Sequence, residues 1–85
     1  MDTEIIPSEQ VTDSARALAA LELAVAEIRC YAAVGDDERA HGREDEVRVA
    51  ALRLIAEYRL IGQDAVTAAE IALSTENIAF GRYCS

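Results

Sequence analysis

The chain has 85 residues, of which 16 are acidic and 8 are basic, and its formal net charge is -8. All the basic residues are arginines, so catalysis through a lysine is excluded. The length fits one domain. The charge disfavours nucleic acids and anionic lipids as partners, because both are bound mainly through Lys and Arg. The acidity favours a protein partner with a basic surface or, alternatively, serves only to keep the protein soluble.

The chain divides into an N-terminal arm over residues 1–10, one helical domain over residues 11–81 and a C-terminal tail over residues 82–85. The arm has neither a basic segment nor an apolar run, so we expect no secretory signal. No segment reaches the roughly 18 consecutive apolar residues that indicate a membrane span. We therefore expect a soluble, cytoplasmic protein whose two cysteines are reduced thiols.

The first predicted helix extends from about residue 9 or residue 12 to Val34. Apolar residues recur in it at every third or fourth position, which places their side chains on one helical face. These residues are Leu18, Leu21, Val25, Ile28 and Ala32. Gly35 is expected to end the helix, because glycine adopts the left-handed conformation at little cost.

The next segment, residues 36–46, permits two interpretations. It is either a charged loop around Gly42 or the start of a helix over residues 37–61 that is capped by Asp36. We favour the helix, because it would pack along the whole length of the first one. Its predicted core face consists of Val47, Ala51, Leu54, Tyr58 and Ile61. Gly62 is expected to end it.

A third helix is predicted over residues 65–80, before Gly81. Its predicted core face consists of Val66, Ala69, Leu73 and Phe80. The pattern therefore predicts an all-α fold with three helices in an up-down-up arrangement, a long helical hairpin plus a shorter third helix. We expect this arrangement to be completed as a dimeric helical bundle.

Each predicted helix also carries a second apolar stripe. In the first helix this stripe consists of Ala19, Leu23, Ala26, Cys30 and Ala33. Three helices packed alone do not cover all these stripes, which predicts a homodimer or an obligate protein partner. We favour a two-fold homodimer, because that symmetry is the most common one. Scattered surface leucines that need no partner are the alternative. The predicted interface consists of Leu23, Ala26, Val49, Leu52, Leu60, Ile71 and Ile78.

One set of potential metal ligands is present. In an up-down-up bundle, Cys30, His41 and Cys84 come from segments that meet at the same end. Two thiolates and an imidazole suit Zn²⁺ or Cu⁺, and the two cysteines alone could form a disulfide. A metal-binding or thiol-redox function is therefore the alternative hypothesis.

The leading hypothesis is a protein that acts through protein–protein interaction, as a regulator, adaptor, inhibitor or immunity-type partner. Acidic recognition is assigned to Asp36, Asp37 and Glu38, which would steer a basic partner. No nucleophile can be paired with a base from the sequence, so we expect neither enzymatic activity nor a cofactor.

Overall fold

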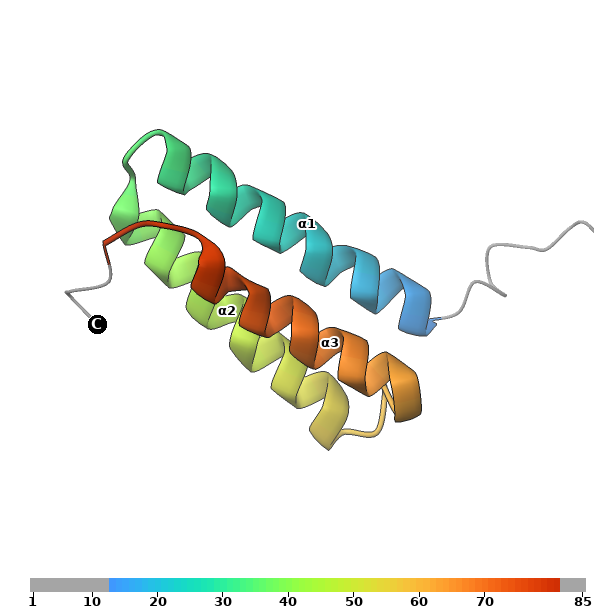
Figure 1. Cartoon of the computed structure of the whole chain (residues 1–85). Coiled ribbons are helices and arrows are strands. Elements are labelled where there is room, and N and C mark those ends of the chain that lie inside the picture. The colour runs from blue at the N-terminus through green and yellow to red at the C-terminus, as the bar shows by residue number, and fades with distance from the viewer. Residues whose placement is uncertain (1–12, 82–85) are drawn as a thin grey trace, which may run out of the picture.

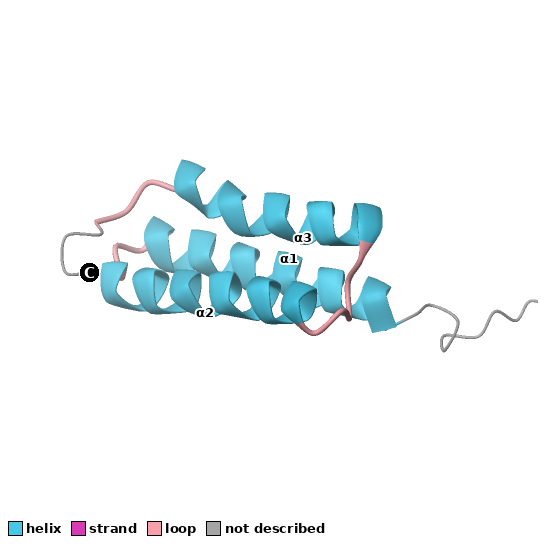
Figure 2. Cartoon of the chain, turned by 90° about the horizontal axis from the view of Figure 1, so that it is seen from below, coloured by secondary structure: helices cyan, strands magenta, loops and turns pink. Residues whose placement is uncertain are grey.

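The computed structural model describes residues 13–81, which form three helices packed against one another. Helix α1 spans Asp13–Ala33, α2 spans Asp37–Ala56 and α3 spans Gly62–Ser74, and a 3₁₀ turn, η2, follows at Thr75–Asn77. Figure 1 shows α1 and α2 as an antiparallel pair, with α3 running parallel to α1. Figure 2 shows that α3 lies against both members of this hairpin. The predicted all-α, up-down-up arrangement is confirmed.

Helix α1 buries the face that the sequence predicts. Leu21, Val25 and Ile28 are buried in the core, together with Ala24. Gly35 has a φ of 79° and ends the helix as expected. Its amide donates to the carbonyl oxygen of Ala32 at 3.1 Å, and the amide of Asp36 donates to that of Tyr31 at 2.9 Å. These two hydrogen bonds form a Schellman motif.

Helix α2 begins directly after this motif, so the helical interpretation of residues 36–46 is correct. The carboxylate of Asp36 accepts a hydrogen bond from the amide of Arg39 at 3.2 Å and caps the helix. Gly42 lies within the helix on an exposed position. The turn between α1 and α2 is therefore short, and the two helices pack as a hairpin.

The predicted end of α2 is wrong. The helix ends at Ala56 instead of residue 61, because Tyr58 takes the left-handed position with a φ of 61°. Gly62, which was expected to end α2, is the first residue of α3. Tyr58 and Ile61 therefore lie beyond the helix, and they are 83% and 67% exposed instead of belonging to the core.

The predicted core face of α3 is wrong in part: Phe80 packs against the core as expected, but Val66 and Leu73 do not belong to it. Ala68 and Ala72 are buried, whereas Val66 and Leu73 are about half exposed. The alanine face allows the backbone of α3 to approach the hairpin closely, and the larger side chains are left outside. Helix α3 also ends at Ser74, six residues before the predicted end at residue 80.

Two residues assigned to the interface belong to the core instead. Leu60 is 1% exposed and Ile78 is 8% exposed. Both were placed on outward stripes on the assumption that α2 and α3 continue through them. Because each helix ends earlier, both side chains follow a turn that brings them back into the bundle.

Candidate functional site

An apolar groove runs between α2 and α3. It is lined by Arg48, Ala51, Leu52, Ile55, Ala69, Ala72 and Leu73, and we call these residues the α2–α3 groove. Its volume is about 250 Å³. Leu52 and Leu73 stand on opposite helices and are 66% and 57% exposed. The α2–α3 groove thus presents large apolar side chains to solvent.

The groove exists because, on each of the two helices, a small buried residue is followed by a large exposed one. Ala51 and Ala72 are buried where α2 meets α3, and their methyl groups fill little space. Leu52 follows Ala51 and Leu73 follows Ala72, and a step of one residue turns each leucine about 100° away from the contact. Ala51 and Ala72 thus form the bottom of the groove, and Leu52 and Leu73 form its two rims.

A buried carboxylate lies next to this groove. Glu44 is 1% exposed, and its Oε2 is 3.2 Å from the Nη2 of Arg48. The same Nη2 donates to the Oγ1 of Thr75 at 3.1 Å, and the hydroxyl of Thr75 donates to the carbonyl oxygen of Ala72 at 3.0 Å. This chain of contacts ties the middle of α2 to the end of α3.

This cluster was not predicted from the sequence. Ala40, Glu44, Val47 and Ala51 follow one another at steps of four, three and four, so Glu44 occupies a core position of α2. That spacing is the signal that could have revealed it. An arginine one turn later, at Arg48, is the partner that a buried carboxylate requires.

The potential metal ligands are not gathered in the part of the chain that the structure describes. Cys30 is exposed on α1. His41 contacts the buried cluster instead: its Nδ1 is 3.9 Å from the Oε1 of Glu44, and its Nε2 is 3.7 Å from the Oδ2 of Asp45. Cys84 lies outside the described residues. Within residues 13–81, no group of three His, Cys, Asp or Glu side chains is arranged to hold a metal ion.

The three acidic residues assigned to recognition differ in their contacts. Asp36 caps α2, and its Oδ2 is 3.5 Å from the Nε of Arg39. Asp37 is half-buried and Glu38 is exposed, and both lie in the first turn of α2. Negative charge there stabilises the helix through its dipole. Asp36 thus has a structural role as the cap of α2.

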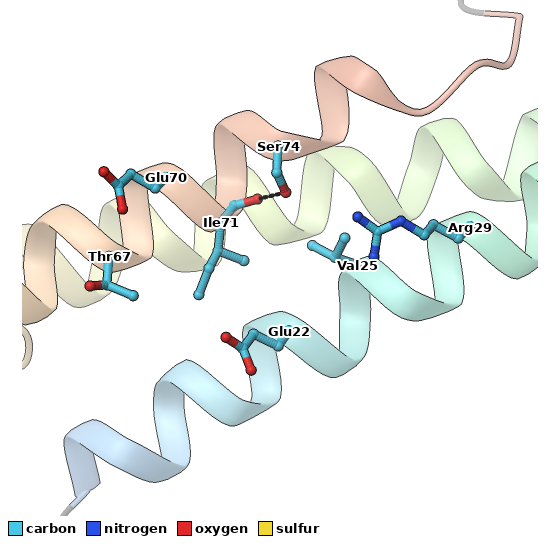
Figure 3. Close-up of a pocket in the computed structure, with 7 residues that line it drawn as sticks. All are labelled: Glu22, Val25, Arg29, Thr67, Glu70, Ile71 and Ser74. Carbon is cyan, nitrogen blue, oxygen red and sulfur yellow. Dashed lines mark hydrogen bonds between the residues drawn. The ribbon is translucent and has the colours of Figure 1, made fainter.

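A second apolar surface lies on α1, opposite to the core. It consists of Ala19, Leu23, Ala26, Cys30 and Ala33, which are all exposed, and we call it the α1 outer face. Leu23 is its largest side chain and is 64% exposed. Glu22 and Arg29 stand along one edge of this face, where they line an open depression between α1 and α3 (Figure 3). The volume of the depression is about 450 Å³.

The residues of the predicted interface therefore fall into three groups. Leu23, Ala26, Val49 and Leu52 are exposed, as a contact surface requires. Ile71 is half-buried, packs against the core and lines the depression in Figure 3. Leu60 and Ile78 are buried in the core and are not available to a partner.

Arg43 links the two helices of the hairpin. Its Nε donates to the Oε1 of Glu27 in α1 at 2.7 Å, and its Nη1 donates to Glu46 one turn further along α2. The hydrogen bonds to Glu27 and then Glu46 raise the pKa of the Arg43 guanidinium. The carboxylate of Glu27 is thus already paired within the same chain, by Arg43.

No helix among the described residues is long and apolar enough to cross a membrane. Compared with known proteins, the chain matches no family model, no curated protein and no solved structure.

Proposed function

We propose that this protein acts by binding another protein in the α2–α3 groove, and not by catalysis. The observation that carries the proposal is the exposure of Leu52 and Leu73 on the rims of an apolar groove. Complete burial of a leucine side chain is worth about 1.5–3 kcal/mol relative to leaving it exposed. A partner that covers both rims would gain a substantial part of that free energy.

The shape and charge of the surface suggest the kind of partner. A groove between two helices accepts a third helix whose apolar side chains recur at steps of three and four. The net charge of -8 favours a partner segment with basic residues beside that apolar stripe. The protein would then work as a cytoplasmic adaptor, regulator or inhibitor that holds a basic amphipathic helix.

A homodimer remains part of the proposal, but it would use a different surface. The α1 outer face lies on the helix that does not line the α2–α3 groove. Two copies joined through α1 would leave both grooves accessible, so that one dimer binds two partner segments.

The test compares the tagged wild-type protein with the double variant L52E/L73E and with a matched control, A50E. Ala50 is exposed on α2 but does not line the groove, so A50E adds a charge without touching the rims. We expect a protein from the source cells to be retained by the wild type and by A50E but not by L52E/L73E. Once purified, the partner should bind the wild type and A50E with similar affinity and L52E/L73E much more weakly. Equal binding to the wild type and L52E/L73E would contradict the proposal.

A further inference from the structure

The α1 outer face has charged residues along its edges as well as small residues at its centre. Glu22 and Arg29 lie seven residues apart, so two helical turns separate them on the same edge. Among residues 13–81 neither side chain takes part in an ion pair or a side-chain hydrogen bond. The acidic residue near the opposite edge, Glu27, is already paired with Arg43 at 2.7 Å.

We infer that two copies of this chain pack α1 against α1 in antiparallel orientation, and that Glu22 of each copy pairs with Arg29 of the other. The inference rests on the proposed function, in which the protein acts through protein contacts. A two-fold axis at the level midway between Val25 and Ala26 produces this register. Residue j of the partner then lies at the level of residue 51 − j, which places the partner's Arg29 at the level of Glu22.

The charges select the antiparallel orientation. In a parallel pair about a two-fold axis, each edge of the face meets the opposite edge of the partner, so Glu22 would face the partner's Glu27 and Arg29 would face the partner's Val34. The Glu22–Glu27 contact would be repulsive and would form twice, and Arg29 would have no acidic partner. The antiparallel pair replaces these two repulsions by two attractions, because the symmetry forms each Glu22–Arg29 contact twice.

The apolar side chains fit the same register. The partner's Ala26 and Cys30 lie at levels 25 and 21, so Leu23 lies midway between them. A large side chain that inserts between the residues of a facing helix is the contact of coiled coils. Small neighbours such as Ala26 leave room for Leu23 and allow the two helices to approach closely.

Cross-linking tests the orientation. In a background of Cys30→Ser and Cys84→Ser, a single cysteine is introduced at position 26 or at position 19. The register places the two copies of residue 26 one residue apart along the axis, or about 1.5 Å, and the two copies of residue 19 thirteen residues apart, or about 20 Å. We expect a short bismaleimide to cross-link Ala26→Cys but not Ala19→Cys. Equal cross-linking of both variants indicates a parallel pair and would overturn the inference.

Charge reversal tests the contacts. We expect Glu22→Arg and Arg29→Glu each to weaken dimerisation by about tenfold, because each change creates two repulsive contacts. The double variant E22R/R29E restores the pairs with opposite polarity and should dimerise within about threefold of the wild type. Sedimentation equilibrium measures the dimer, and circular dichroism shows that each variant is folded. A double variant that is as weak as the single ones, or a wild type that stays monomeric at millimolar concentration, would overturn the inference.

The groove variant separates this inference from the proposed function. L52E/L73E should dimerise like the wild type. If L52E/L73E is monomeric while E22R still dimerises, the dimer uses the α2–α3 groove and the α1 arrangement is wrong. If dimerisation follows the α1 variants but no partner depends on Leu52 and Leu73, only the proposed function fails.

Discussion

Gly35 and Tyr58 occupy the same position of the same helix-ending motif, one after α1 and the other after α2. Their φ angles are 79° and 61°. After α2, the amide of Tyr58 donates to the carbonyl oxygen of Ile55 at 3.1 Å, and that of Arg59 donates to the carbonyl oxygen of Leu54 at 2.9 Å. The amides of Gly35 and Asp36 form the same pair of hydrogen bonds at the end of α1. The backbone geometry is thus shared, although only one of the two residues is suited to it.

We predict that Tyr58→Gly stabilises the protein. The left-handed conformation costs a residue with a side chain about 1–2 kcal/mol, and Tyr58 is 83% exposed, so its removal loses little packing. Part of the gain is offset by the greater backbone freedom of glycine in the unfolded chain, which leaves about 0.5–1 kcal/mol. Urea unfolding measures the change. The matched control is Gly35→Ala, which should destabilise by about 1 kcal/mol through the backbone alone, since no atom lies within 4 Å of the added methyl group.

A second prediction concerns Leu60 and Ile78, which lie in the core, and Leu52, which lies on the surface. Leu60→Ala and Ile78→Ala should each lower the free energy of unfolding by about 2–4 kcal/mol, because both side chains are buried. Leu52→Ala should change it by no more than about 0.5 kcal/mol. Thermal unfolding of the three variants makes the comparison. A large loss for Leu52→Ala would mean that Leu52 is covered in solution before a heterologous partner is added.

Substitutions of the buried Glu44 and of its partly exposed partner Arg48 should be non-additive. Arg48→Met leaves a carboxylate that is 1% exposed without its arginine partner, and we expect a loss of about 1–3 kcal/mol. The double variant E44M/R48M removes both charges and should cost less than the sum of the two single changes by about 1–2 kcal/mol. Urea denaturation of all four proteins closes the cycle. Strict additivity would show that the pair contributes nothing as a pair.

Helix capping and partner recognition can be separated within the acidic turn. Asp36→Ala should cost about 1 kcal/mol of stability, whereas Asp36→Asn keeps an oxygen for the amide of Arg39 and should cost little. The double variant D37N/E38Q keeps the cap and should lower the association rate with the basic partner about two- to fivefold at low salt. Stopped-flow association and thermal unfolding measure the two effects. An unchanged association rate would show that Asp37 and Glu38 do not attract the partner and serve only to stabilise α2.

The ion pair between the hairpin helices should depend on salt and not on pH in the neutral range. The hydrogen bonds to Glu27 and Glu46 raise the pKa of Arg43 above that of the unfolded chain. A raised pKa of a basic group contributes stability that is complete below the unfolded pKa and is lost only above it, well beyond neutral pH. Arg43→Met should cost about 0.5–1 kcal/mol at low salt, and less at 1 M NaCl, at every pH between about 6 and 10. A loss that varies across that range would point to another titrating group.

The core face of α1 was predictable from the sequence and that of α3 was not, for a physical reason. In α1, the larger apolar residues Leu21, Val25 and Ile28 lie on one face, and the opposite stripe consists mainly of alanine. In α1 the face with the larger apolar side chains is therefore also the buried face. In α3, the stripe through Val66 and Leu73 competes with the stripe through Ala68 and Ala72 at nearly the same spacing. The larger residues suggested the wrong face, because close packing against a hairpin favours the smaller ones.

The candidate site was predictable only in part. The exposure of Leu52 followed from its place outside the core stripe of α2. The groove did not, because it requires Leu73 on the opposite rim, and the phase of α3 was wrong. The Glu44–Arg48–Thr75 cluster joins two helices, and periodicity within one helix carries no information about a partner on another. The early end of α2 could not be predicted, because the left-handed position that ends a helix is usually glycine and here is Tyr58.

The two roles of Asp36 have a consequence for the order of folding. Its amide closes α1 by binding Tyr31 and its carboxylate opens α2 by binding Arg39, so the ordering of one residue restricts both helices at once. Helix formation is limited by nucleation, and the ends of the two helices share a nucleus at this turn. The α1–α2 hairpin is therefore expected to form early, from contacts close together in the chain, and α3 to dock on it afterwards. The groove between α2 and α3 is then completed in the last step of folding.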